Sequence, residues 1–255
     1  MKEDSESIIR GISWASLIYS LKGEEDNYID AIMALRKNDF GSSPGKALVD
    51  FLNKWRMRVP SYKYDNLERS IGLTIVNEIN KWYLENNQSL QSLPNSLVSH
   101  DLECTDTKDL ISSVYKPLCR IPHLGDTAAG KILHVLRPNF FVAWDNDIRL
   151  HYTNNDSEKT GSSAYLSFLR RMQVFAREIT DHSKNIDRVL SDKLVEVIRG
   201  NLESQPNGHA KESAKRRLNY LMNYGKPLPK YIDEYNWITI TNGIRVPPVW
   251  TPLIL

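Results

Sequence analysis

Apolar residues recur mostly three or four positions apart along this chain, and the strict alternation that is typical of strands is scarce. Polar stretches rich in glycine, proline, asparagine and serine predict loops, among them residues 88–95. The spacing predicts helices near residues 5–21, 26–38, 43–57, 65–86, 107–117, 126–136, 146–153, 162–181, 186–200, 209–223 and 228–235. We therefore expect an all-α protein.

The segment 237–255 has a different pattern. Apolar and hydroxyl side chains alternate from Ile238 to Thr241, and an Asn-Gly pair and a Pro-Pro pair follow. This pattern predicts a tail of extended chain that lies over the helices.

Composition places the chain among ordinary globular proteins, with 255 residues, 41% hydrophobic and 25% charged. Its two cysteines, Cys104 and Cys119, are too few for a four-thiolate zinc or iron–sulfur site, so we expect no metal and no cofactor. No apolar stretch approaches the roughly 18–20 residues of a membrane span, and the acidic start does not look like a signal peptide. We expect a soluble, cytoplasmic protein.

The net charge of +2 excludes a histone-like polycation, but the charge is unevenly distributed. Residues 1–30 include three basic and seven acidic side chains, whereas residues 205–231 include six basic and one acidic. A solvated helix surface is one explanation of the basic segment, and an anion-binding face is the other. For the second explanation the candidate phosphate-binding residues are Lys211, Lys215, Arg216 and Arg217.

The most informative stretch is 121–149. A helix that ends near Pro117 is followed by a tight turn closed by Gly125, and a second helix then begins. The first N–H groups of that helix are unpaired and lie at the positive end of its dipole, so they can bind a phosphate. The spacing predicts a buried stripe on the second helix and Thr127, Lys131 and His134 on its polar side. The stripe consists of Ala128, Ala129, Ile132, Leu133 and Leu136.

Ile-Pro-His-Leu-Gly at 121–125, Thr-Ala-Ala-Gly at 127–130 and Asp-Asn-Asp-Ile at 145–148 resemble the helix-hairpin-helix DNA glycosylases. In that family the hairpin reads Leu-Pro-Gly-Val-Gly-x-x-Thr-Ala, and a catalytic aspartate heads a helix some twenty residues later. The resemblance implies one compact unit, 1–255, with the two-subdomain helical fold of these enzymes. Residues 40–150 would form a central subdomain, with the hairpin at about 107–136. Residues 1–39 and 151–255 would form the second.

Three departures from the family pattern change what the resemblance implies. His123 replaces a glycine of the hairpin, which matters if the turn requires a positive φ there. Thr127 stands where the lyase-active members have the Schiff-base lysine, and the iron–sulfur cysteines of some members are absent. The resemblance therefore implies a monofunctional glycosylase.

Each candidate site residue has a functional and a structural interpretation. Asp145 is the candidate catalytic residue, because a carboxylate stabilises the positively charged sugar of base excision, but aspartate is also a common N-cap. Trp144 is the candidate base-stacking residue or a core residue. Lys131 is a phosphate contact or, if desolvated, an amine nucleophile. The remaining phosphate-binding candidates are His123, Leu124, Gly125 and Thr127.

These observations predict a DNA glycosylase that hydrolyses the N-glycosidic bond of a damaged or mispaired base flipped from duplex DNA, in base excision repair. Two alternatives stay open. One is a non-catalytic helix-hairpin-helix protein that binds nucleic acid, and the other is a helical interaction protein in which the hairpin is only a tight turn. We expect a monomer that binds duplex DNA and makes no membrane contact.

Overall fold

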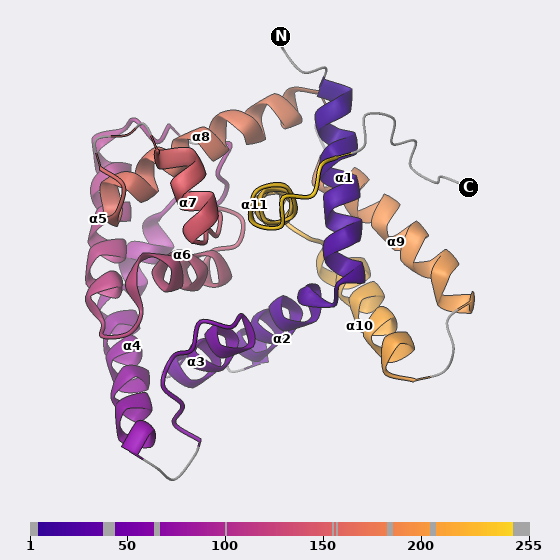
Figure 1. Ribbon diagram of the computed structural model, residues 1–255. Helices are drawn as coiled ribbons and strands as arrows, with labels where there is room; N and C mark the ends of the chain where they lie inside the picture. The colour runs from indigo at the N-terminus through magenta and orange to yellow at the C-terminus, as the bar shows by residue number, and fades with distance from the viewer. Residues whose placement is uncertain are drawn as a thin grey trace.

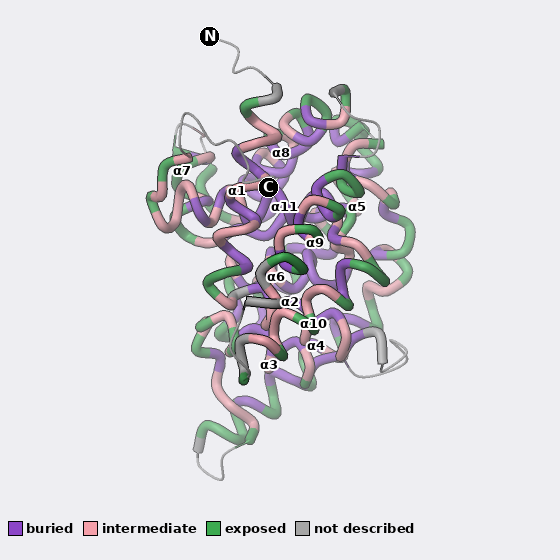
Figure 2. Tube along the Cα trace, turned by 90° about the vertical axis from the view of Figure 1, so that its right-hand side faces the viewer, coloured by how far each residue is buried: buried purple, intermediate pink, exposed green. Residues whose placement is uncertain are grey.

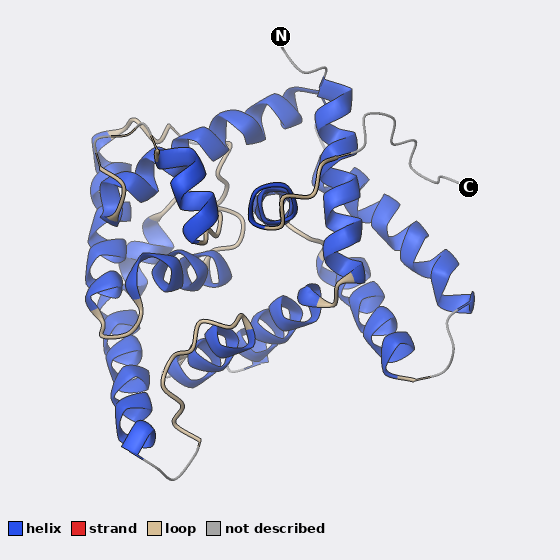
Figure 3. Ribbon diagram, in the orientation of Figure 1, coloured by secondary structure: helices blue, strands red, loops and turns tan. Residues whose placement is uncertain are grey.

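The computed structural model describes residues 5–37, 44–63, 67–99, 101–154, 156, 158–182, 186–204 and 208–246. Within these ranges the chain forms helices and no strand (Figure 3), which confirms the predicted all-α class. The helices are α1 (Ser5–Leu21), α2 (Glu24–Lys37), α3 (Gly45–Lys54), α4 (Leu67–Ser92), α5 (Thr105–Arg120), α6 (Gly125–Leu136), α7 (Asn146–Thr153), α8 (Gly161–His182), α9 (Ile186–Ser204), α10 (His209–Tyr224), α11 (Leu228–Asn236) and the π-helix η1 (Trp237–Thr241).

Helix α11 occupies the middle of the molecule, where Figure 1 shows it end-on. Helices α4 to α7 lie on one side of it, α1, α9 and α10 lie on the other, and α2 and α3 run below. Helix α11 packs against α1, α8 and η1, and most of its residues are buried. The view from the side shows the same arrangement, with exposed positions on the outer faces of the helices (Figure 2).

Helix α6 packs closely against the aromatic core. Its predicted apolar stripe is buried throughout, with exposures between 0% and 8%, which confirms that prediction. Trp144 lies in an aromatic cluster with Tyr165 and Phe168, at ring-centroid distances of 4.9 and 5.3 Å. A Cβ atom added at Gly130 would lie 2.8 Å from Cδ1 of Trp144. The approach of α6 to this indole therefore requires a glycine.

Among the predicted helix ends that differ from the structure, two lie at sequence signals for a loop or a helix end. The polar stretch 88–95 is helical as far as Ser92, because Leu90 lies on the buried face of α4 and fixes these residues against the core. Helix α5 continues beyond Pro117 to Arg120, with the proline inside its last turns. In both places packing of an apolar face outweighs the local helix-breaking composition.

The predicted extended tail is also wrong in its first part. Residues Trp237–Thr241 form a π-helix that continues α11, closed by a hydrogen bond of 3.0 Å from Asn242 N–H to the Trp237 carbonyl. Ile238 is fully buried and packs with Ala15 and Tyr19 of α1. This anchoring outweighs the alternating pattern of the sequence. Residues 247–255 of the predicted tail lie outside the described residues.

In the described part of the chain, no helix combines the length and the apolar character that crossing a bilayer requires.

Candidate functional site

The hairpin turn connects α5 to α6 through residues 121–124. His123 and Gly125 both have left-handed backbone conformations, with φ of +69° and +64°. The turn thus requires a positive φ at the position where the resembled family has glycine, and here a histidine adopts it at a steric cost. His123 and Gly125 are exposed, whereas Leu124 is buried and donates its N–H to the Ile121 carbonyl at 3.1 Å.

The first turn of α6 is tied to the segment that leads to Asp145. The indole N–H of Trp144 donates to the carbonyl oxygen of Asp126 at 3.1 Å, and the Tyr115 hydroxyl donates to the same oxygen at 3.1 Å. The Asp126 carboxylate accepts the N–H of Gly161 at 3.0 Å. These bonds hold the hairpin and the residue before Asp145 in one rigid arrangement.

Asp145 is the N-cap residue of α7. Its Oδ1 accepts the N–H of Ile148 at 2.9 Å, which is the usual capping bond. Its Oδ2 accepts the hydroxyl of Thr241, in η1, at 2.7 Å. The carboxylate is thus oriented by two hydrogen bonds, and the residue remains partly exposed.

Asp145 lines a cavity of about 250 Å³, which we call the Asp145 cavity. Lys131 of α6 and Trp144 also line it, so the structure brings three of the predicted site residues together. The exposed residue Arg56 also lines the Asp145 cavity, so the cavity lies at the molecular surface. The other lining residues are Tyr19, Trp55, Ile148, Asp233, Trp237 and Thr241.

Lys131 and Trp144 differ in how they contribute to this cavity. The Lys131 Nζ atom lies 3.6 Å from the sulfur of Met57 and 5.0 Å from the ring centroid of Trp55, and the residue is partly exposed. Trp144 is fully buried, so it is a core residue whose surface also forms part of the cavity wall.

Sequence patterns do not identify the residues that reach the cavity from other parts of the chain. Trp55 and Arg56 directly follow α3. Arg56 has a left-handed backbone conformation, with φ of +59°, which its residue type does not predict. Asp233 and Thr241 come from α11 and η1, about ninety positions beyond Asp145. No local signal connects these segments, because only the tertiary packing brings them together.

Three basic side chains of α10 form ion pairs, and two of them bind acidic residues of α2. Arg217 binds Asp26 through two nitrogens, at 2.9 and 3.1 Å, and Arg216 binds Asp30 at 2.7 Å. Partial burial alone would raise the pKa of Asp26, but hydrogen bonds from Arg217 and Ser213 outweigh it and lower the pKa.

The ion pairs change the interpretation of the charge asymmetry. Arg216 and Arg217 neutralise Asp30 and Asp26 of the acidic segment, and Lys215 pairs with Glu212 of its own helix at 2.8 Å. Lys211 is partly exposed. Helix α10 lies on the opposite side of the molecule from α5 (Figure 1), so its charges do not extend the hairpin surface.

A second group of charges is sealed inside the molecule. This buried ion network consists of Glu25, Lys226, Lys230, Asp233 and Glu234, with exposures of 0% to 6%. Lys226 binds Glu25 and lies 2.9 Å from Glu234, and Lys230 lies 2.6 Å from Asp233. Burial alone would lower the pKa of Lys226, but the nearby Glu234 and Glu25 carboxylates raise it above its usual value.

His134 is wrongly predicted on the polar side of α6. It is fully buried, its Nδ1 lies 2.7 Å from the Phe141 carbonyl, and its ring stacks on Tyr28 at 5.5 Å. Burial lowers its pKa to about 4, so it is neutral at physiological pH. The α2 helix covers this face of α6, which the periodicity of α6 alone does not indicate.

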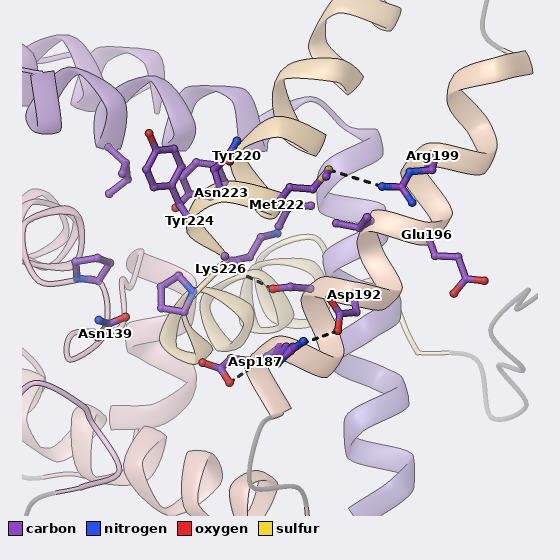
Figure 4. A pocket seen from close by; sticks show the side chains of 18 of the residues that line it. Asn139, Asp187, Asp192, Glu196, Arg199, Tyr220, Met222, Asn223, Tyr224 and Lys226 are labelled. Carbon is purple, nitrogen blue, oxygen red and sulfur yellow. Dashed lines mark hydrogen bonds and ion pairs between the residues drawn. The ribbon is translucent and has the colours of Figure 1, made fainter.

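A larger cavity of about 1020 Å³ lies between α9 and α10 (Figure 4). Its described lining includes none of the predicted site residues. Side chains on its walls contact one another: Arg188 pairs with Asp192 at 3.7 Å, and Arg199 lies 3.7 Å from the sulfur of Met222. Within the described ranges, no three histidine, cysteine, aspartate or glutamate side chains are grouped as a metal site requires.

In comparisons with known proteins, no family model, curated sequence or solved structure matches this chain significantly.

Proposed function

We propose that this protein is a monofunctional DNA glycosylase of the helix-hairpin-helix type, which removes a damaged or mispaired base from duplex DNA. The observation that supports the proposal most directly is the position of Asp145 at a surface cavity that it shares with Lys131 and Trp144. A base must leave the stack before its glycosidic bond can be reached, and such a cavity can receive it.

Asp145 has the chemistry that hydrolysis of an N-glycosidic bond requires. The bond breaks through a sugar that carries positive charge at its anomeric carbon, and a fixed carboxylate stabilises that charge. The bonds from Ile148 N–H and the Thr241 hydroxyl fix its orientation. The positive end of the α7 dipole lies beside the carboxylate.

The hairpin supplies the DNA-binding surface in this proposal. Pro122, His123 and Gly125 are exposed at the tip, next to the N-terminus of α6. A phosphate bound there would fix the register of the duplex, because backbone contacts position DNA without reading its sequence. The hydrogen bond between Trp144 and Asp126 would transmit that register to Asp145.

The test is base excision from duplex oligonucleotides that carry single deaminated, oxidised, alkylated or mismatched bases. We expect the wild-type protein to leave an alkali-labile abasic site on at least one substrate, and Asp145→Asn to lower the rate by about 10²–10³. Asp147→Asn is the matched control, because Asp147 lies in the same helical turn, is exposed and does not line the cavity. Equal rates for wild type and Asp145→Asn would contradict the proposal.

One observation favours a second function, which is nucleic-acid binding without catalysis. Both carboxylate oxygens of Asp145 accept hydrogen bonds within the protein, as they would in a purely structural N-cap. For this second function we expect salt-dependent binding of the duplex, with no excision of any base by the wild-type protein.

A further inference from the structure

Two ammonium groups lie over the ring of Trp55, on the wall of the Asp145 cavity. The Nζ of Lys131 is 5.0 Å from the ring centroid, and that of Lys230 is 5.1 Å from it. Lys230 is fully buried and Lys131 lines the cavity. This aromatic wall already interacts with cations, which offsets the attraction that an indole usually offers to a positively charged ligand.

The charges at the cavity also differ in how they are balanced. Asp233 faces the cavity but is paired with Lys230 at 2.6 Å, so little of its negative charge remains uncompensated. Asp145 supplies the negative charge for the sugar in the proposed function. Lys131 and Arg56 are the cationic side chains of the lining. Since the volume is only about 250 Å³, a base that fills the cavity lies near Lys131.

From this arrangement we infer that Lys131 stabilises negative charge on the departing base, and that the protein acts on neutral bases rather than on cationic alkylated bases. The inference rests on the proposed glycosylase function. A neutral base, such as a deaminated or oxidised one, leaves as an anion and gains from a nearby ammonium. A base that already carries a positive charge leaves as a neutral molecule, and the same ammonium repels it before the bond breaks.

The bond between the anomeric carbon and the base nitrogen breaks, and both electrons go to the nitrogen, so the base becomes an anion beside Lys131. The sugar becomes a cation beside Asp145. A water oxygen then bonds to the anomeric carbon, and the proton that it loses passes to the Asp145 carboxylate and from there to solvent. The base anion takes a proton from solvent.

The experiment measures single-turnover excision from two sets of duplexes, one with uracil, hypoxanthine or 8-oxoguanine and one with 7-methylguanine. For the wild-type protein we expect excision from the first set and at least a tenfold slower rate on the second. Lys131→Met keeps the length and the apolar contacts of the side chain but removes its charge. It should lower the rate on the neutral base about 100-fold and leave the rate on 7-methylguanine unchanged or higher, because the repulsion of the cationic base is lost with the ammonium.

Lys131→Arg restores the charge and should restore most of the rate, and Lys81→Met, at an exposed position of α4, is the control for the substitution itself. If the wild-type protein excises 7-methylguanine faster than the neutral bases, the inference is overturned and the glycosylase proposal stays intact. This comparison requires only the wild-type protein. An equal loss on both sets in Lys131→Met would also overturn it. If the wild-type protein excises no base, the proposed function fails and the inference fails with it.

Discussion

Lysines and carboxylates meet at two neighbouring places in this molecule, and the two places differ in what surrounds the charges. In the buried ion network, Lys226 and Lys230 contact Glu25, Asp233 and Glu234 with almost no access to solvent. At the Asp145 cavity, Asp145 and Lys131 are partly exposed and border empty space. Asp233 belongs to both, because it pairs with Lys230 and also lines the cavity.

The same residue types therefore have a structural role where they are buried and, in our proposal, a ligand-binding role where they border open space. Inside the network two ammonium groups and three carboxylates contact one another with almost no access to solvent. At the cavity the bonds to Asp145 orient the carboxylate, but the adjoining space remains open. This contrast has measurable consequences for stability.

The largest effect is expected for Lys226→Met. The variant leaves Glu25 and Glu234 buried beside each other without their shared cation, so we expect the free energy of unfolding to fall by about 3–5 kcal/mol. Urea denaturation measures it, with Lys81→Met as an exposed control that should change stability by less than about 0.5 kcal/mol. A loss below about 1 kcal/mol in Lys226→Met would show that the network contributes little to stability.

An intermediate effect is expected from His134, which lies beside the network. Its pKa in the folded protein is about 4, below the usual 6.5, so between these pH values the unfolded chain binds more protons than the folded one. The free energy of unfolding should therefore fall as the pH drops from 6.5 to 4, by about 3 kcal/mol from this group. Urea denaturation across this range should give a shallower pH dependence for His134→Gln, and equal slopes would contradict the assignment.

The smallest effect is expected for Asp145→Asn. Asparagine is as good an N-cap as aspartate, and its side-chain oxygen can still accept the Ile148 N–H, so stability should change by less than about 0.5 kcal/mol. Thermal and urea denaturation provide the measurement. If Asp145→Asn lowered the free energy of unfolding as much as Lys226→Met, the main role of Asp145 would be structural, which would contradict its assignment to the site.

The helices were predictable because each one carries an apolar stripe that repeats every three or four residues. Helices α1 and α7 begin and end where the spacing predicts, and α4 is longer because Leu90 continues its stripe through a polar stretch. The error at residues 237–241 has the opposite origin. Alternating apolar and hydroxyl residues indicate a strand locally, but the burial of Ile238 against α1 holds them in a helical turn.

The candidate site was predictable only where its residues are close in sequence. Lys131, Trp144 and Asp145 lie within fifteen positions of one another, in the segment that resembles the glycosylase hairpin. Trp55 and Asp233 join them through long-range packing, which no local pattern encodes. The basic residues of α10 were assigned by charge alone, and the acidic partners of Arg216 and Arg217 lie almost two hundred positions away, as the separation of 191 between Asp26 and Arg217 shows.

Because η1 is a π-helix, the geometry of the site depends on the number of residues in this segment as well as on their identity. Its wider turn holds one more residue than an α-helical turn, and successive residues of a helix are rotated by about 100°. Thr241, the last residue of η1, is in register to donate its hydroxyl to Asp145. A chain one residue shorter in this stretch would turn a different side chain toward the carboxylate, even with every residue that lines the cavity conserved.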